Sequence, residues 1–245
     1  KTNLPKVFIR SLARHDLNFN DFSLPRDIQE QLKSFVTNHK NILITGSTGS
    51  GKTSFLRLLL REIPASEHLI TIEDTRELDP KQDYCTSLEE REQGLSMKEL
   101  FRHSLRMSPD RLILGEMRGP EALSFLLAMN SGHEGLMSTL HANSAQEALE
   151  RVALLFHFYN TETSLPHSVL MELLAKNVEY VIHCENLAVK EVIQVKGVER
   201  NRPIFDVVWS REAEATLESF SAQARGNREA KWSLFSPGNA HTKAE

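Results

Sequence analysis

The segment best suited to chemistry is residues 46–53, which read GSTGSGKT and fit the pattern G-x-x-x-x-G-K-T. It directly follows the apolar run NILIT and directly precedes the run FLRLLLREI, so a strand should lead into it and a helix should leave it. Glycines at these spacings allow positive φ angles, and successive backbone N–H groups can then face one point at the positive end of the helix. The pattern therefore predicts a phosphate-binding loop.

The sequence also predicts roles for individual side chains of this loop. Lys52 supplies a mobile charge for the β- and γ-phosphates of a nucleotide, and the Thr53 hydroxyl is suited to ligate Mg²⁺. A GTPase would normally carry an N-K-x-D motif that reads the base, and the sequence has none, so we expect ATP. The predicted nucleotide contacts of the loop are Gly46, Ser47, Thr48, Gly49, Ser50, Gly51, Lys52, Thr53 and Ser54.

Acidic residues follow two predicted core strands. The segment ITIEDTREL contains Glu73, Asp74 and Glu77, and the segment RMSPDRLILGEMRG ends its apolar run at Glu116. Ligands of open α/β sheets bind at the carboxyl ends of strands, where a carboxylate can orient or activate the attacking water or hold Mg²⁺ through its waters. A single acidic residue there is ordinarily a helix cap or a solvated charge. Two clusters favour a catalytic site with Glu116 beside the phosphate loop.

A pair of histidines brackets a further apolar run. The segment SGHEGLMSTLHANS places His133 before this run and His141 after it. Both are flanked by small residues that allow a ligand to approach closely. A lone histidine is usually structural, but this arrangement predicts two side chains that sense the γ-phosphate.

The elements that must position these residues alternate between strand and helix. Apolar runs at residues 42–45, 69–72, 112–114 and 136–140 predict strands, and amphipathic helices are predicted to begin at Lys52, Ser96, Pro120 and Ser144. Ser96 with Glu99, and Ser144 with Glu147, match the S-x-x-E capping box, and Gly132 suits a helix end. Such alternation is typical of an α/β fold with a parallel sheet covered by helices.

Further elements are predicted on both sides of this core. A short strand over residues 6–11 and a helix from 25 to about 36 precede it. A helix over 166–176 follows, and then β-rich runs at 178–184, 189–195 and 204–209, which predict a small antiparallel addition at the sheet edge. After Ser210 the periodicity fades, so we expect a mobile tail or a weak helix.

Composition excludes several other classes. With 40% hydrophobic residues, 25% charged residues and a formal net charge of -4, nothing global indicates that the chain wraps a polyanion. Cys85 and Cys184 have no CxxC spacing, so neither a disulfide framework nor a four-thiolate zinc site is expected. No apolar run reaches the length of a membrane span, which favours a cytosolic protein. The chain begins with Lys1 rather than Met, so we expect a fragment.

Taken in order, GSTGSGKT, IEDTREL, SPDRLILGEMRG and GHEGLMSTLHANS resemble the Walker A, Asp box, atypical Walker B and His box of the type II/type IV secretion ATPase superfamily. The resemblance covers residues from about 6 to 209. Within the superfamily the chain is most similar to the CpaF-like, Tad-pilus and type IV secretion branch, because FIRSLAR precedes the core and no tetracysteine insertion follows it.

The resemblance implies roles for individual residues. Catalysis would fall to the Walker B carboxylate, an Asp-box acid, the His-box residues and an arginine, which are Glu116, Glu77, His133, His141 and Arg118. The nucleotide would also be contacted by two Asp-box acids and two arginines of the interdomain segment, namely Glu73, Asp74, Arg10 and Arg14. Mg²⁺ would be ligated by Thr53, with Glu116 acting through water. Arginine suits such positions because its planar charge neutralises phosphate charge that grows in the transition state.

The resemblance also implies an architecture. We expect a RecA-like P-loop ATPase domain over residues 41–209, preceded over 1–40 by the end of a missing N-terminal domain and its linker, and followed by a tail over 210–245. The expected activity is ATP hydrolysis by a homo-oligomer, a hexameric ring, that powers secretion or type IV/Tad pilus assembly. Expected partners are inner-membrane platform or secretion-channel proteins, and the expected location is cytoplasmic, at the inner membrane. Direct nucleic-acid contact is not expected.

Three other functions stay open on sequence grounds. A nucleic-acid translocase on a similar core should show DNA-stimulated hydrolysis, and the negative net charge argues mildly against it. A non-hydrolysing ATP-binding scaffold is disfavoured by the retention of Lys52, Glu116 and both histidines. A small-molecule kinase would leave the His box unexplained, and the chain has no obvious arginine-rich lid.

Overall fold

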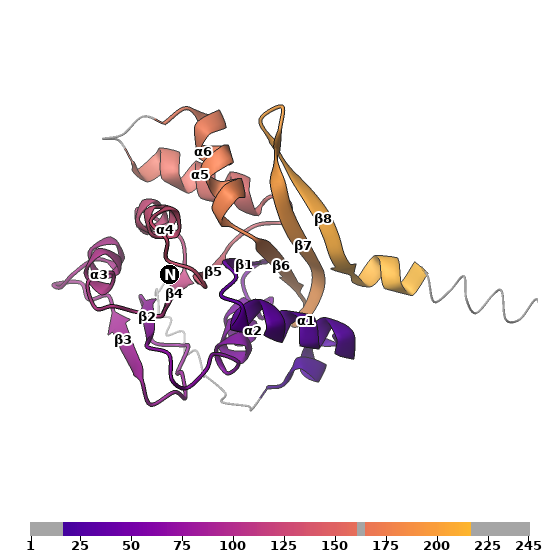
Figure 1. The fold of residues 1–245 in the computed structure, drawn as a ribbon, viewed down its shortest axis with the longest axis horizontal. Helices are drawn as coiled ribbons and strands as arrows, with labels where there is room; N and C mark the ends of the chain where they lie inside the picture. The colour runs from indigo at the N-terminus through magenta and orange to yellow at the C-terminus, as the bar shows by residue number, and fades with distance from the viewer. Residues whose placement is uncertain (1–16, 161–164, 217–245) are drawn as a thin grey trace, which may run out of the picture.

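An eight-stranded sheet forms the centre of the protein, seen in a computed structural model that describes residues 17–160 and 165–216 (Figure 1). The strands follow the order β3-β2-β4-β5-β1-β6-β7-β8. The first six strands in this order, from β3 to β6, are mutually parallel, and β7 pairs antiparallel with both β6 and β8. The strands are β1 Ile42–Thr45, β2 Leu69–Glu73, β3 Cys85–Glu89, β4 Arg111–Glu116, β5 Met137–Leu140, β6 Tyr180–Glu185, β7 Ala188–Glu199 and β8 Arg202–Ser210. The predicted mainly parallel α/β fold is confirmed.

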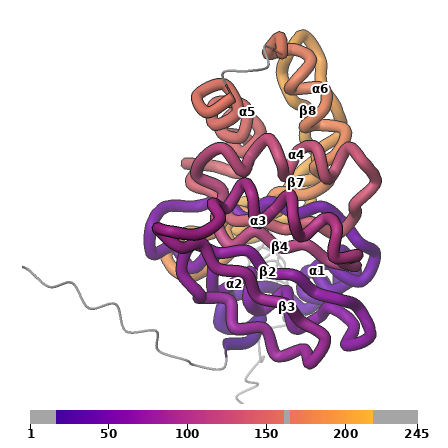
Figure 2. Tube along the Cα trace, turned by 90° about the vertical axis from the view of Figure 1, so that its left-hand side faces the viewer, coloured from indigo at the N-terminus to yellow at the C-terminus, as the bar shows by residue number. Residues whose placement is uncertain are grey.

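Helices cover both faces of the sheet. They are the 3₁₀ turn η1 Phe19–Phe22 and the helices α1 Arg26–Thr37, α2 Lys52–Leu60, α3 Met97–Ser104, α4 Glu121–Asn130, α5 Ala148–Tyr159 and α6 His167–Asn177. Figure 1 shows α3 to α6 on one side of the strands and α1 with α2 on the other. In the view turned by 90°, α4 and α2 again lie on opposite sides of β4 (Figure 2).

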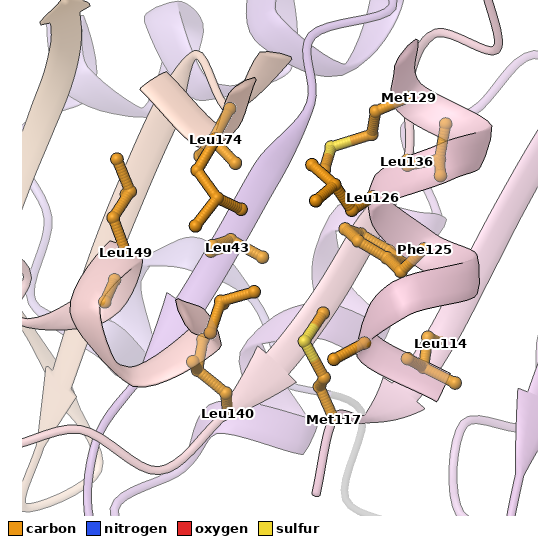
Figure 3. Packing of buried hydrophobic residues seen from close by; sticks show 14 of the residues in the cluster. Leu43, Leu114, Met117, Phe125, Leu126, Met129, Leu136, Leu140, Leu149 and Leu174 are labelled. Carbon is orange, nitrogen blue, oxygen red and sulfur yellow. The ribbon is translucent and has the colours of Figure 1, made fainter. Parts of the chain in front are cut away.

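Each strand of the parallel part therefore contributes to two hydrophobic cores. In β1, Leu43 faces the core under α3 to α6, whereas Ile42 and Ile44 face the core under α1 and α2. Figure 3 shows Leu43 near Leu140 of β5, with Phe125 of α4 among the side chains of the same core. Burial on both faces explains why inner strands such as β1 appear in the sequence as continuous apolar runs.

Helix starts follow the sequence signals in some places and depart from them in others. The Ser96–Glu99 capping box is confirmed, because each residue's side chain bonds the other's backbone N–H. The second predicted box is only half formed: the Glu147 backbone N–H donates to Oγ of Ser144 at 3.3 Å, but α5 begins at Ala148 rather than Ser144. The Glu147 carboxylate instead accepts hydrogen bonds from the backbone and side-chain amides of Asn143, at 3.3 and 2.9 Å.

Two strand predictions also need correction. Strand β3 was not predicted, because its sequence CTSLE is half exposed and has no apolar run. Strand β6 was expected in an antiparallel addition, but it pairs in parallel with β1, with Ile42 opposite Tyr180, so only β7 and β8 form that addition. The predicted strand over residues 6–11 and the tail beyond residue 216 lie outside the described residues.

Among the helices of the described residues, none combines the length and apolarity needed to cross a bilayer.

Candidate active site

The carboxyl ends of β1, β2, β4 and β5 meet at one edge of the sheet, where a cleft of about 470 Å³ opens. Its lining includes most of the residues expected to bind nucleotide. It consists of Thr48, Gly49, Ser50, Gly51, Lys52, Thr53, Ser54, Glu73, Asp74, Thr75, Glu77, Gly115, Glu116, Arg118, His141 and Leu187. Gly46 and Ser47 line a second, neighbouring cleft together with Thr48 and His141.

The loop after β1 has the backbone geometry that its glycines predict. Gly46, Gly49 and Gly51 have φ angles of 148°, 75° and 99°, which L side chains rarely adopt. A Cβ on Gly46 would also lie 2.3 Å from the carbonyl oxygen of Cys184. Gly51 is the residue before the first turn of α2, so the unpaired N–H groups of that turn face the cleft side of the loop.

The Lys52 side chain is held against the backbone of this loop. Its Nζ donates hydrogen bonds to the carbonyl oxygens of Gly46 at 3.0 Å and Ser47 at 2.8 Å, and only 7% of the residue is exposed. Burial lowers the pKa of Lys52, while the Glu116 carboxylate acts against that change. A buried ammonium whose hydrogen-bond partners here are carbonyl oxygens gains much from a phosphate group.

Glu116 is delivered to the cleft by an irregularity in β4. The pairing of β4 with β5 shifts between Leu114 and Glu116, which faces Thr139. The Thr139 hydroxyl donates to the carbonyl oxygen of Gly115 at 2.7 Å. Such bulges re-aim a side chain next to a binding site, and here Glu116 comes to lie 2.7 Å from Nε2 of His141.

Glu73 has a different environment from the other acidic residues of the cleft. Its Oε1 atom accepts hydrogen bonds from the backbone N–H groups of Glu77 and Leu78, both at 2.9 Å. The residue is 3% exposed, and this burial raises its pKa. Gly115 leaves room for it, since a Cβ there would lie 2.9 Å from Cγ of Glu73. Through these hydrogen bonds Glu73 holds the loop after β2 in place. This loop forms one wall of the cleft.

Arg118 connects the two acidic segments. Its guanidinium forms ion pairs with Asp74 and, at 3.7 Å, with Glu116. The backbone N–H groups of Arg118 and Gly119 donate to the Glu121 carboxylate at 2.6 and 2.7 Å. The side chain is 50% exposed, so it sits at the rim of the cleft with its charge facing both carboxylates.

His133 does not reach this cleft. It precedes β5 and lies at the amino end of the strand, beside His39 and Asp110 in a separate hollow of about 250 Å³. His141 follows β5 and lies at the carboxyl end of the strand, in the cleft of about 470 Å³ that also contains the phosphate loop, called the phosphate cleft below. Because a strand runs from one edge of a sheet to the other, residues before and after it are placed on opposite edges. The prediction that both imidazoles meet at one phosphate is therefore wrong for His133 in this chain.

The sequence analysis missed three residues that line the cleft, namely Thr75, Gly115 and Leu187. Leu187 lies in the turn between β6 and β7 and lines the cleft. No sequence signal identified it, because the predicted strands stopped at 184 and resumed at 189. Arg10 and Arg14 lie outside the described residues.

Comparisons with known proteins identify a family for this chain. The model of the type II/IV secretion system protein family matches residues 2–227. The chain is 43% identical over 180 residues to the type IV secretion system protein PtlH of Bordetella pertussis, covering 71% of this chain and 50% of that protein. It is 37% identical to VirB11 of Bartonella quintana, covering 66% and 47%. The chain thus spans about half the length of these relatives.

Solved structures give the same picture of the fold. The VirB11 ATPase of the Brucella suis type IV secretion system, in complex with sulphate, superposes with a TM-score of 0.61 at 31% identity, over 76% of this chain and 53% of that one. The pilus retraction motor PilT with bound ADP superposes with a TM-score of 0.58 at 22% identity, over 90% and 62%, which speaks to the fold alone. Both agree with the RecA-like core expected from the sequence.

Proposed function

Because this chain belongs to the type II/IV secretion system ATPase family, we propose that it is the ATP-hydrolysing motor domain of a bacterial secretion or pilus-assembly machine. The observation that carries the proposal is the meeting of Lys52, Glu116 and His141 in one cleft at the carboxyl edge of the sheet. The phosphate loop binds the anion, and the Glu116 carboxylate, which the His141 imidazole contacts, lies beside the position of the terminal phosphate.

The reaction is phosphoryl transfer to water. Glu116 accepts a hydrogen bond from the attacking water and aligns its oxygen with the γ-phosphorus. The new P–O bond forms as the bond to the bridging oxygen of ADP breaks, and the proton of the water passes to the carboxylate. Lys52 and the N–H groups at the start of α2 stabilise the charge on the phosphate oxygens, so positioning and electrostatics lower the barrier.

Two further side chains position this carboxylate. His141, in the tautomer with a proton on Nε2, donates to Glu116 and fixes its orientation. Arg118 approaches Glu116 from the rim and supplies positive charge that is present at any physiological pH. Asp74 and Glu77 add oxygen atoms to the same wall of the cleft.

The residues present fit Mg²⁺, which accompanies nucleotide phosphates and prefers oxygen ligands and water. The Thr53 hydroxyl lines the cleft directly after Lys52, and Glu116 offers a carboxylate. We propose that Thr53 ligates the ion and that Glu116 reaches it through water. The bound ion would neutralise charge on the β- and γ-phosphates.

The wider assignments follow from the family. We propose that the chain assembles with copies of itself into a hexameric ring, and that it docks on inner-membrane platform or secretion-channel proteins at the cytoplasmic face. The proposed division is a linker and leading helix over 1–40, the ATPase domain over 41–209 and a tail over 210–245. Size-exclusion chromatography with and without a non-hydrolysable ATP analogue tests ring formation.

The test of the ATPase function measures ATP binding and phosphate release by the 245-residue chain with Mg²⁺. Lys52→Ala is expected to weaken ATP binding by about 10- to 100-fold, because a charged hydrogen-bond donor to phosphate is lost. Lys196→Ala is the control, since Lys196 pairs with Asp206 on the β7–β8 hairpin. Unchanged ATP affinity in Lys52→Ala, or a chain that neither binds nor hydrolyses ATP, contradicts the proposal.

A further inference from the structure

The turn between β6 and β7 has an unusual residue at its tip. Glu185 pairs with Ala188, so the turn consists of two residues, Asn186 and Leu187, with φ angles of 51° and 60°. Two-residue turns of this kind favour Asn at the first position and Gly at the second. Leucine in the left-handed region is strained, and such strain concentrates at functional sites.

Leu187 rests on the phosphate loop. Its backbone N–H donates to the carbonyl oxygen of Ser50 at 3.1 Å. A Cβ on Gly51 would lie 3.3 Å from Cα and 3.5 Å from Cδ2 of Leu187, so the leucine covers the residue that precedes α2. Yet Leu187 is 62% exposed. An apolar side chain is thus held in a strained conformation at the lining of the phosphate cleft without being buried by the described residues of the chain.

The surrounding contacts fix the position of the turn. The Arg211 guanidinium donates to the carbonyl oxygens of Val189 at 2.8 Å, Phe22 at 3.2 Å and Ser23 at 3.1 Å. The Phe22 ring packs on Phe55 of α2, with centroids 4.8 Å apart. These contacts connect the turn, through η1, to helix α2, which follows the phosphate loop. The position of Leu187 is therefore fixed before any ligand binds.

The sheet order gives the cleft a direction. Strand β1, which leads into the loop, lies between β5 on one side and β6 on the other. Glu116 and His141 come from β4 and β5, so the reacting end of the nucleotide lies on that side. Leu187 comes from the opposite side, because it follows β6. A nucleotide carries its base at the end opposite to its terminal phosphate, and the base offers flat apolar faces.

We propose that the Leu187 side chain packs against the base of the bound nucleotide and contributes to affinity for nucleosides rather than for phosphate alone. This inference rests on the nucleotide-binding function proposed above. The β6–β7 turn would then present an apolar surface, the Leu187 side chain, to the base. This role explains why a leucine occupies a strained position in the turn and why its side chain is exposed.

Leu187→Gly is the informative variant, because glycine prefers the φ angle already present and the Asn-Gly sequence favours this turn. Its thermal unfolding midpoint should therefore be no lower than that of the natural chain. Isothermal calorimetry would compare ATP with inorganic tripolyphosphate, both with Mg²⁺. We expect about tenfold weaker ATP binding and unchanged tripolyphosphate binding, since only part of a leucine contact is lost.

Two further variants sharpen the comparison. Asn201→Gly makes the same kind of change at the second position of the two-residue turn between β7 and β8, where φ is 64°, and should leave ATP affinity as it was. Leu187→Met keeps an apolar side chain of similar size and should retain most of the ATP affinity.

Unchanged ATP affinity in Leu187→Gly overturns the proposal, as does an equal loss for ATP and tripolyphosphate. Either result leaves nucleotide binding itself intact, provided that Lys52→Ala weakens ATP binding. If the natural chain binds neither ATP nor tripolyphosphate, the proposed nucleotide function is overturned, and the proposed role of Leu187 is overturned as well.

Discussion

Nε2 of His141 lies 2.7 Å from Oε1 of Glu116, joining the ends of β5 and β4 at the phosphate cleft. The strand order makes this possible, because β5 lies between the strand that leads into the phosphate loop and the strand that carries Glu116. A residue at the end of β5 can therefore reach both. The imidazole limits the orientations of the carboxylate, which then needs little reorganisation when a nucleotide binds.

Glu116→Gln should separate binding from turnover. The amide keeps the size of the side chain but cannot accept the proton of the attacking water. We expect ATP affinity close to that of the natural chain and a kcat lower by about 10²- to 10⁴-fold, the usual contribution of a general base. Single-turnover phosphate release would check this, and turnover at the natural rate would rule out the proposed role.

His141→Ala should lower kcat with little change in KM, because the imidazole acts through Glu116 rather than on the nucleotide. His141→Gln, whose amide can donate to the carboxylate, should recover part of the loss. His133→Ala is the informative partner, since His133 lies at the other edge of the sheet. Equal losses in His141→Ala and His133→Ala, measured on the isolated chain, would contradict the placement of the two histidines.

Gly46→Ala should disrupt the loop sterically. The added Cβ would lie 2.3 Å from a backbone oxygen of Cys184 and 2.4 Å from Oγ of Ser50, and the backbone oxygen cannot move away cheaply. We expect the free energy of unfolding to fall by about 1–3 kcal/mol, with loss of ATP binding. Gly197→Ala is a matched control for stability, because φ is 144° there against 148° at Gly46 but nothing lies within 4 Å. Equal destabilisation in urea titrations would show that strain in φ, rather than the contact, is responsible.

Glu73→Gln should change how stability depends on pH. Burial raises the pKa of Glu73 above its ordinary value of 4.5, so just above pH 4.5 the folded state keeps a proton that the unfolded state has lost. Stability from this group is therefore greatest at low pH and falls as the pH rises through the folded-state pKa. Glutamine can accept the same two N–H groups without titrating.

The variant should thus gain stability relative to the natural chain as the pH rises from 4.5, and the gain should level off once Glu73 is ionised in both states. Urea unfolding of both proteins at several pH values between 4.5 and 8 measures the difference. A difference that stays constant across this range would show that the buried carboxyl has no raised pKa.

Much of the fold followed from local patterns in the sequence. Strands buried on both faces, such as Ile42–Thr45, read as apolar runs, and the Gly-rich loop was recognised by its spacing and its flanking elements. Strand β3 was missed because an edge strand of sequence CTSLE needs few apolar residues. The pairing of β6 with β1 depends on residues far apart in the chain, which periodicity does not report.

The site was predictable to a similar degree. Lys52, Glu116 and His141 were each expected at strand ends, and parallel strands bring such ends to one edge. His133 was misplaced although its position before β5 was clear from the sequence, because the prediction overlooked that residues before and after one strand lie at opposite edges of a sheet. Glu73 was expected to bind nucleotide, and its bonds to Glu77 and Leu78 depend on a loop conformation that no pattern specifies.

The central claim is that the terminal phosphate of one nucleotide lies between Lys52 and Glu116. A crystal structure of the chain with Mg²⁺ and a non-hydrolysable ATP analogue tests it most directly. We predict that Nζ of Lys52 leaves the carbonyl oxygens of Gly46 and Ser47 to contact the β- and γ-phosphates, and that Glu116 faces the γ-phosphate through one water. A nucleotide bound elsewhere, or a γ-phosphate with Glu116 turned away from it, would contradict the account.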